Sequence, residues 1–154
     1  MLDRNEYYLE ILNYPKEELF DLADKCTAVL LHAAIDEVGS EEKNLPYDLV
    51  IDLVFMYAFH DGYVTEDKRK LIKDLFLLEM SDEELLDLQK FQSSSHEGVQ
   101  KLLRKLRVDE EFTDTEFLLG LCIYALDGEI TVDEQVLLER NTRKDIIKYE
   151  KGNA

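Results

Sequence analysis

Two Asp-Gly pairs mark the places where this sequence could hold a cation. The segment FHDGYVTEDK contains Asp61, and the segment ALDGEITVDE contains Asp127 with Glu134 seven residues further on. Carboxylate oxygens are the ligands that Ca²⁺, Mg²⁺ and Mn²⁺ prefer in proteins. If both turns lie at one end of the molecule, Asp61, Asp127 and Glu134 could converge on one divalent cation.

A standard EF-hand calcium loop is excluded at both places. Asp-Gly, an apolar residue and a later Glu match the second half of such a loop, with Glu134 at its last ligand position. The loop also needs oxygen donors at its first and third positions. Those positions are Ile123 and Ala125 in the second copy and aromatic residues in the first, which also has Lys68 in place of the closing Glu.

Histidine residues allow another metal chemistry. His32, the pair His60–Asp61 and Asp127 occur in the order used by helical metal-dependent phosphohydrolases of the HD type. Such a site would hold Mn²⁺ or Co²⁺ through imidazole and carboxylate and activate water for attack on phosphorus. Against this interpretation, helical spacing puts His32 on a charged face of its helix rather than on the apolar stripe.

The elements that must position these residues read as helices. After Pro15, apolar residues recur at helical spacing from Leu19 to Ala34, and Gly39 offers a C-terminal stop. Residues 49–59 and the segment FLLGLCIYAL are apolar nearly all round, which predicts two central helices. No segment alternates as a strand would, so the sequence predicts an all-α fold.

Helix starts are marked by capping boxes, in which Ser or Thr is followed three residues later by Glu. The pattern predicts helices opening at Ser81, Thr113 and Thr131, and a further helix starting at Thr65. Glu134 therefore has an alternative role as the capping partner of Thr131. The basic segment KLLRKLR, residues 101–107, is expected to form a short amphipathic helix that neutralises nearby acids.

The Asp-Gly pairs can also be explained without a ligand. Gly62 and Gly128 can adopt positive φ and end a helix, and Asp61 and Asp127 can accept hydrogen bonds from backbone N–H groups in the turn. The sequence thus predicts two pseudo-repeated helix–Asp-Gly–helix hairpins whose apolar arms pack together. Gly120 would permit the arms to approach closely.

The net charge of −17 limits the classes of partner. So acidic a surface repels phosphate backbones and anionic membranes and attracts cations and basic proteins. The N-terminus lacks the apolar core of a secretory signal, and no apolar run approaches the roughly 20 residues that span a bilayer. Cys26 and Cys122 lie in apolar sequence, which favours buried reduced thiols and a cytoplasmic protein.

The segments YAFHDGYVTEDKRKLIKDLF and LCIYALDGEITVDEQVLLER resemble the two halves of the TerB-like fold of tellurite resistance, also found at the N-terminus of DjlA-type membrane co-chaperones. The resemblance covers residues 45–143. It implies a helical bundle with no established catalytic activity, a link to stress or tellurite resistance, and metal binding through Asp61, Asp127 and Glu134. Lys68 departs from the pattern, because it stands where the first half should have its Glu.

We therefore expect one all-α domain over residues 1–154, a bundle of about seven helices. Its parts would be N-terminal helices over residues 1–44, a first hairpin half over 45–95 and a second over 96–150. The predicted function is that of a non-enzymatic, bacterial, TerB-like accessory protein. It would act in stress or tellurite resistance through contacts with a protein partner, which its acidity suggests is basic, and could bind Ca²⁺, Mg²⁺ or Mn²⁺.

The acidic segment DEEFTDTE, residues 109–116, favours an alternative function. Five acids in eight residues could form a docking patch for a basic protein. The chain would then be a small acidic immunity or inhibitor protein that blocks a cationic toxin or nuclease by electrostatically steered binding. The metal-dependent phosphohydrolase is the third hypothesis. Neither nucleic acid nor membrane insertion is expected.

Overall fold

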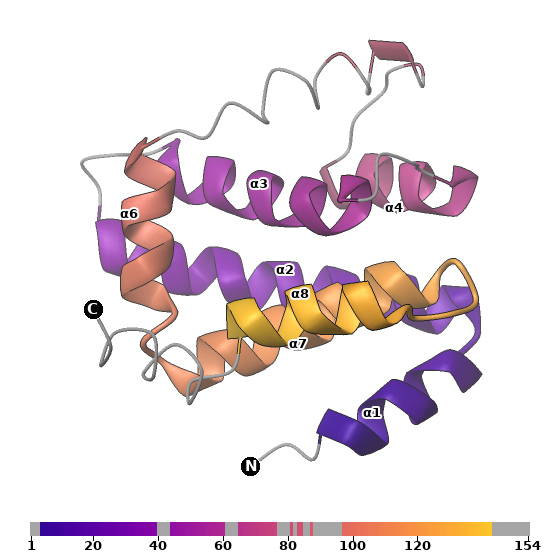
Figure 1. The fold of residues 1–154 in the computed structure, drawn as a ribbon. Helices are drawn as coiled ribbons and strands as arrows, with labels where there is room; N and C mark the ends of the chain where they lie inside the picture. Colours follow the sequence, from indigo (N-terminus) through magenta and orange to yellow (C-terminus); the bar gives the residue numbers. More distant parts are fainter. Residues whose placement is uncertain are drawn as a thin grey trace.

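The computed structural model describes residues 4–39, 44–60, 65–76, 81, 83, 84, 87 and 97–142. Within these ranges the chain forms seven α-helices, one 3-10 helix and no strand, which confirms the all-α prediction (Figure 1). The helices are α1 (Arg4–Glu10), η1 (Ile11–Asn13), α2 (Lys16–Val38), α3 (Leu45–Phe59), α4 (Glu66–Phe76), α6 (Glu97–Leu106), α7 (Glu110–Ala125) and α8 (Val132–Thr142).

Helix α7 lies at the centre of the bundle. It packs against α2, α3 and α8, and η1 also contacts it. Helix α6 crosses one end of the bundle, where it packs against α2 and α3 (Figure 1). In this part of the chain no helix is both long and apolar enough to cross a membrane.

The apolar pattern explains the packing of the long helices. In α2, buried side chains recur every three or four residues, at Leu19, Ala23, Cys26, Leu30 and Ala34, which is the spacing of one helix face. Gly39 ends this helix as predicted, with φ of +73° and its N–H donating to the Ile35 carbonyl at 2.9 Å.

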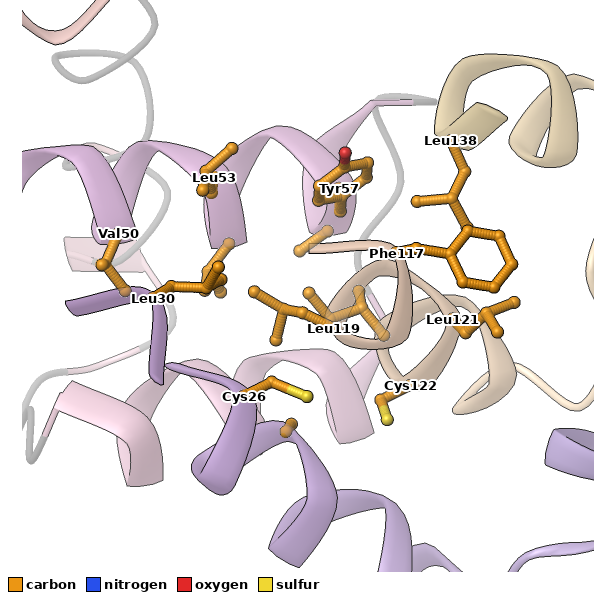
Figure 2. Packing of buried hydrophobic residues seen from close by; sticks show 14 of the residues in the cluster. Cys26, Leu30, Val50, Leu53, Tyr57, Phe117, Leu119, Leu121, Cys122 and Leu138 are labelled. Atoms are coloured by element: carbon orange, nitrogen blue, oxygen red, sulfur yellow. The ribbon is translucent and has the colours of Figure 1, made fainter. Parts of the chain in front are cut away.

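Both predicted central helices, α3 and α7, have buried residues around most of their circumference. Their side chains interdigitate with those of α2 and α8 in one apolar core (Figure 2). Burying each Leu or Phe side chain contributes about 1.5–3 kcal/mol. Cys26 of α2 and Cys122 of α7 lie in this core as buried free thiols, as predicted.

Gly120 lies where α7 approaches α8 closely. A Cβ at this position would lie 2.5 Å from Leu138 Cδ1 of α8 and 3.5 Å from the Tyr57 ring of α3. Gly120 is therefore required for the close approach of α7 to α8, whereas a Cβ would make only an ordinary contact with α3. The prediction that Gly120 lets the arms of the two hairpins approach closely stays a prediction.

Three of the four predicted helix starts are present. Thr131 and Thr65 each accept the backbone N–H three residues on, at 3.1 and 3.3 Å, and α8 and α4 follow them. Ser81 accepts the Glu84 N–H at 3.2 Å. The segment KLLRKLR lies in α6 and the turn after it, with its leucines buried.

The predicted start at Thr113 is wrong. Helix α7 begins three residues earlier, because the Asp109 carboxylate accepts the Glu111 N–H at 3.1 Å and caps the helix. Thr113 lies inside the helix, where its hydroxyl donates to the Glu110 carbonyl at 3.0 Å. Glu116 is bound by Arg107 instead of returning to Thr113.

Candidate functional site

The second Asp-Gly turn follows directly from the end of α7. The Asp127 N–H donates to the Tyr124 carbonyl at 3.2 Å, and the Gly128 N–H donates to the Ala125 carbonyl at 3.0 Å. Gly128 has φ of +84°, the left-handed conformation predicted for it. The turn leaves the Asp127 side chain partly exposed at the end of the central helix.

The Asp127 carboxylate forms an ion pair with Lys68. The Lys68 ammonium, in the first turn of α4, lies 2.8 Å from Asp127 Oδ2. The lysine side chain is 1 % exposed, whereas that of Asp127 is 23 % exposed. A buried ammonium needs a nearby anion to offset its lost hydration. Asp127 therefore already binds a cation, and that cation belongs to the protein itself.

Glu134 is buried and bound within its own helix start. Its carboxylate accepts the Thr131 N–H at 2.9 Å, and its N–H donates to the Thr131 hydroxyl at 3.1 Å. This reciprocal pair is the capping box that the sequence predicted. Lys68 has the same position relative to Thr65 but carries no carboxylate. Its side chain instead reaches Asp127.

The structure describes two of the three predicted metal ligands, and both have partners within the protein. Asp61 lies outside the described residues, Asp127 pairs with Lys68, and Glu134 caps α8. In the described part of the chain, no group of three or more His, Cys, Asp or Glu side chains could hold a metal ion. The cation site formed by Asp61, Asp127 and Glu134 remains a prediction.

The histidines of the phosphohydrolase hypothesis are both exposed. His32 lies on the polar face of α2, as its spacing predicted. His60 follows the last residue of α3, and its ring centre lies 5.7 Å from that of Tyr124. Asp127, the third candidate residue, has the Lys68 ammonium beside it.

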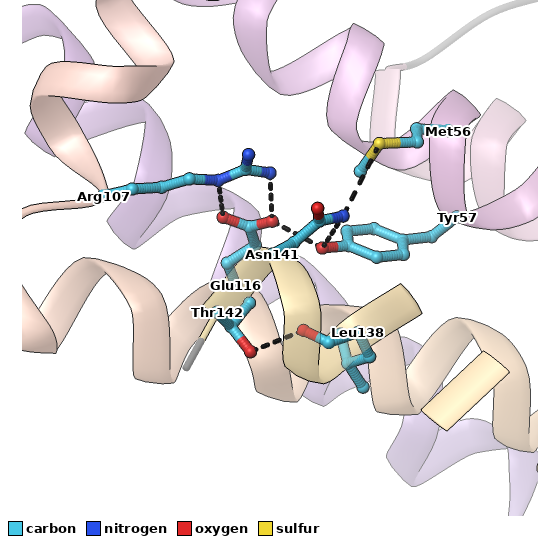
Figure 3. A network of polar contacts seen from close by, with 7 residues as sticks. All are labelled: Met56, Tyr57, Arg107, Glu116, Leu138, Asn141 and Thr142. Carbon is cyan, nitrogen blue, oxygen red and sulfur yellow. Dashed lines mark hydrogen bonds and ion pairs between the residues drawn. The ribbon is translucent and has the colours of Figure 1, made fainter. Parts of the chain in front are cut away.

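A second, mostly buried polar network joins three helices and one turn (Figure 3). Arg107 binds Glu116 through two hydrogen bonds, 2.9 Å from Nε to Oε1 and 2.7 Å from Nη2 to Oε2. The Tyr57 hydroxyl donates to Glu116 Oε2 at 2.5 Å, and the Asn141 amide donates to the Tyr57 oxygen at 3.4 Å. This network connects α3, α7 and α8 with the turn after α6.

Burial and charge together shape the electrostatics of this network. Desolvation raises the pKa of Tyr57 well above its ordinary value, and the Glu116 carboxylate raises it further. Burial acts to lower the pKa of Arg107, but the adjacent Glu116 carboxylate outweighs burial, so this pKa is raised. Tyr57 is therefore a neutral donor and Arg107 a permanent cation.

The sequence contained a signal for this network that the capping-box interpretation obscured. Glu116 precedes ten apolar or small residues and lies in a helix that is buried around most of its circumference. A carboxylate in such a helix needs a cationic or donor partner. The nearest arginine, Arg107, is at the end of the basic segment that was expected to neutralise nearby acids.

The proposed acidic docking patch is smaller than its sequence suggested. Asp109, Glu110 and Glu111 are exposed at the start of α7. Asp114 is half-buried, and Glu116 is fully buried in its pair with Arg107. Only the first three acids of the segment are therefore open to a partner along their full side chains.

Comparison with known proteins adds no assignment. No protein-family model matches this sequence, and neither the curated proteins nor the solved structures gave a significant match.

Proposed function

We propose that this chain is a non-enzymatic, TerB-like helical domain of the bacterial cytoplasm that acts by binding another protein in a stress or resistance system. The observation that carries this proposal is the ion pair between Lys68 and Asp127. Asp127 is the best candidate for a catalytic or metal-binding carboxylate, and in this ion pair it holds α4 against the end of α7.

The other chemistry-bearing side chains support the same function. Glu134 is used for helix capping, and Glu116 binds both Tyr57 and Arg107 in the core. Groups committed to internal contacts cannot readily reach a substrate. What remains available to a partner is the acidic surface.

That surface favours a basic partner. The chain carries 35 acidic residues against 18 basic ones. Exposed carboxylates lie along α2, at Asp21, Asp24 and Asp36, as well as at the start of α7. An acidic field of this kind accelerates the association of a cationic protein, and the effect falls with ionic strength.

The proposal is tested by affinity capture from a native bacterial lysate, with stepwise elution between low and high salt and identification by mass spectrometry. A specifically enriched basic protein that elutes as salt rises is the expected result. Phosphatase assays with Mn²⁺ and Co²⁺ form the second arm. Turnover that Asp61→Ala abolishes would establish an enzyme and overturn the proposal.

The exposed acids at the start of α7 favour one second candidate, the acidic inhibitor of a basic toxin or nuclease. Neutralising Asp109, Glu110 and Glu111 to Asn or Gln would then slow association with the toxin. A matched variant with Asp21, Asp24 and Asp36 changed to Asn has the same net charge. Equal association rates for the two variants would argue against a docking patch at α7.

A further inference from the structure

We draw no further inference here: the strongest candidate, the exposed apolar pair Val132 and Val136 one turn apart on the outer face of α8, is an apolar face with nothing in the structure to show what covers it.

Discussion

The Lys68–Asp127 ion pair joins two side chains with very different access to water. The lysine is 1 % exposed and the aspartate 23 %. Asp127→Asn leaves a buried ammonium without its counter-charge, which we expect to cost about 3 kcal/mol. Lys68→Met leaves a carboxylate that water can still reach and should cost only about 1 kcal/mol. Urea unfolding at pH 7 measures both, and equal losses would contradict the geometry.

The same pair makes a prediction about metal binding. The Lys68 ammonium contacts Asp127 Oδ2, so a metal ion would have to compete with the lysine for this oxygen. Lys68→Glu removes that competitor and adds a second carboxylate near Asp127. We expect this variant to melt at a lower temperature than the unchanged protein and to regain stability with millimolar Ca²⁺ or Mn²⁺.

Thermal-shift measurements across Ca²⁺, Mg²⁺ and Mn²⁺ provide the check, with Lys68→Met as the control that adds no ligand. The unchanged protein should respond less than Lys68→Glu. A large rise in the unchanged protein that Asp127→Asn removes would show instead that metal displaces the lysine. That result would restore the site of Asp61, Asp127 and Glu134 predicted from the sequence.

At the scale of the helices, local spacing is enough to predict most of what the structure contains. Apolar periodicity predicts α2, and continuous apolar runs predict α3 and α7. Both patterns can be recognised because a buried helix face needs apolar residues at nearby positions in the sequence. The predicted start of α7 at Thr113 is wrong because the pattern of Thr followed three residues later by Glu also occurs inside helices. The choice of cap depended on Asp109, four residues before Thr113.

Contacts between distant residues leave no such trace. Neither Lys68 nor Asp127 has a neighbour in sequence that identifies its partner, and Tyr57 meets Glu116 only because α3 packs on α7. The sequence predicted Asp127 as an acceptor of backbone N–H groups in the turn or as a cation ligand, and it did not predict the Lys68 ammonium that lies beside it. The pseudo-repeat of the two hairpins stays a prediction, since residues 61–64 lie outside the described part of the chain.

Gly120 gives a test of how tightly the helices pack. Gly120→Ala should gain about 1 kcal/mol of helix propensity. It would also place a methyl group 2.5 Å from Leu138 Cδ1 in a closed core, and such overpacking costs about 1–3 kcal/mol. We expect a net loss of about 1 kcal/mol in the free energy of unfolding.

A double-mutant cycle isolates the contact. Leu138→Ala alone should cost about 2–5 kcal/mol by creating a cavity. In the double variant the new methyl group enters space that Leu138 has vacated, so the combined loss should be smaller than the sum of the two single losses. Additive losses of unfolding free energy would show that a side chain at position 120 does not clash with Leu138.

For the molecule as a whole, the buried core predicts a loss of stability at alkaline pH. Burial raises the pKa of Cys26 from its ordinary value of 9.0 to about 12, and it raises that of Cys122 as well, with a smaller effect from nearby Cys26. Above pH 9 the unfolded thiols lose protons that the folded protein retains. The thiol contribution is therefore complete below pH 9 and falls by up to about 1.4 kcal/mol per pH unit for each thiol.

Tyr57 adds to this loss above pH 10, because its pKa in the fold is raised well beyond 10.0 by burial and by Glu116. Urea midpoints measured between pH 7 and pH 11 should stay level and then decline from about pH 9. Cys26→Ala combined with Cys122→Ala should start less stable yet decline less steeply between pH 9 and pH 10, where the tyrosine contributes less than the two thiols. An equally steep decline in that variant would mean that groups other than the two thiols cause the alkaline loss.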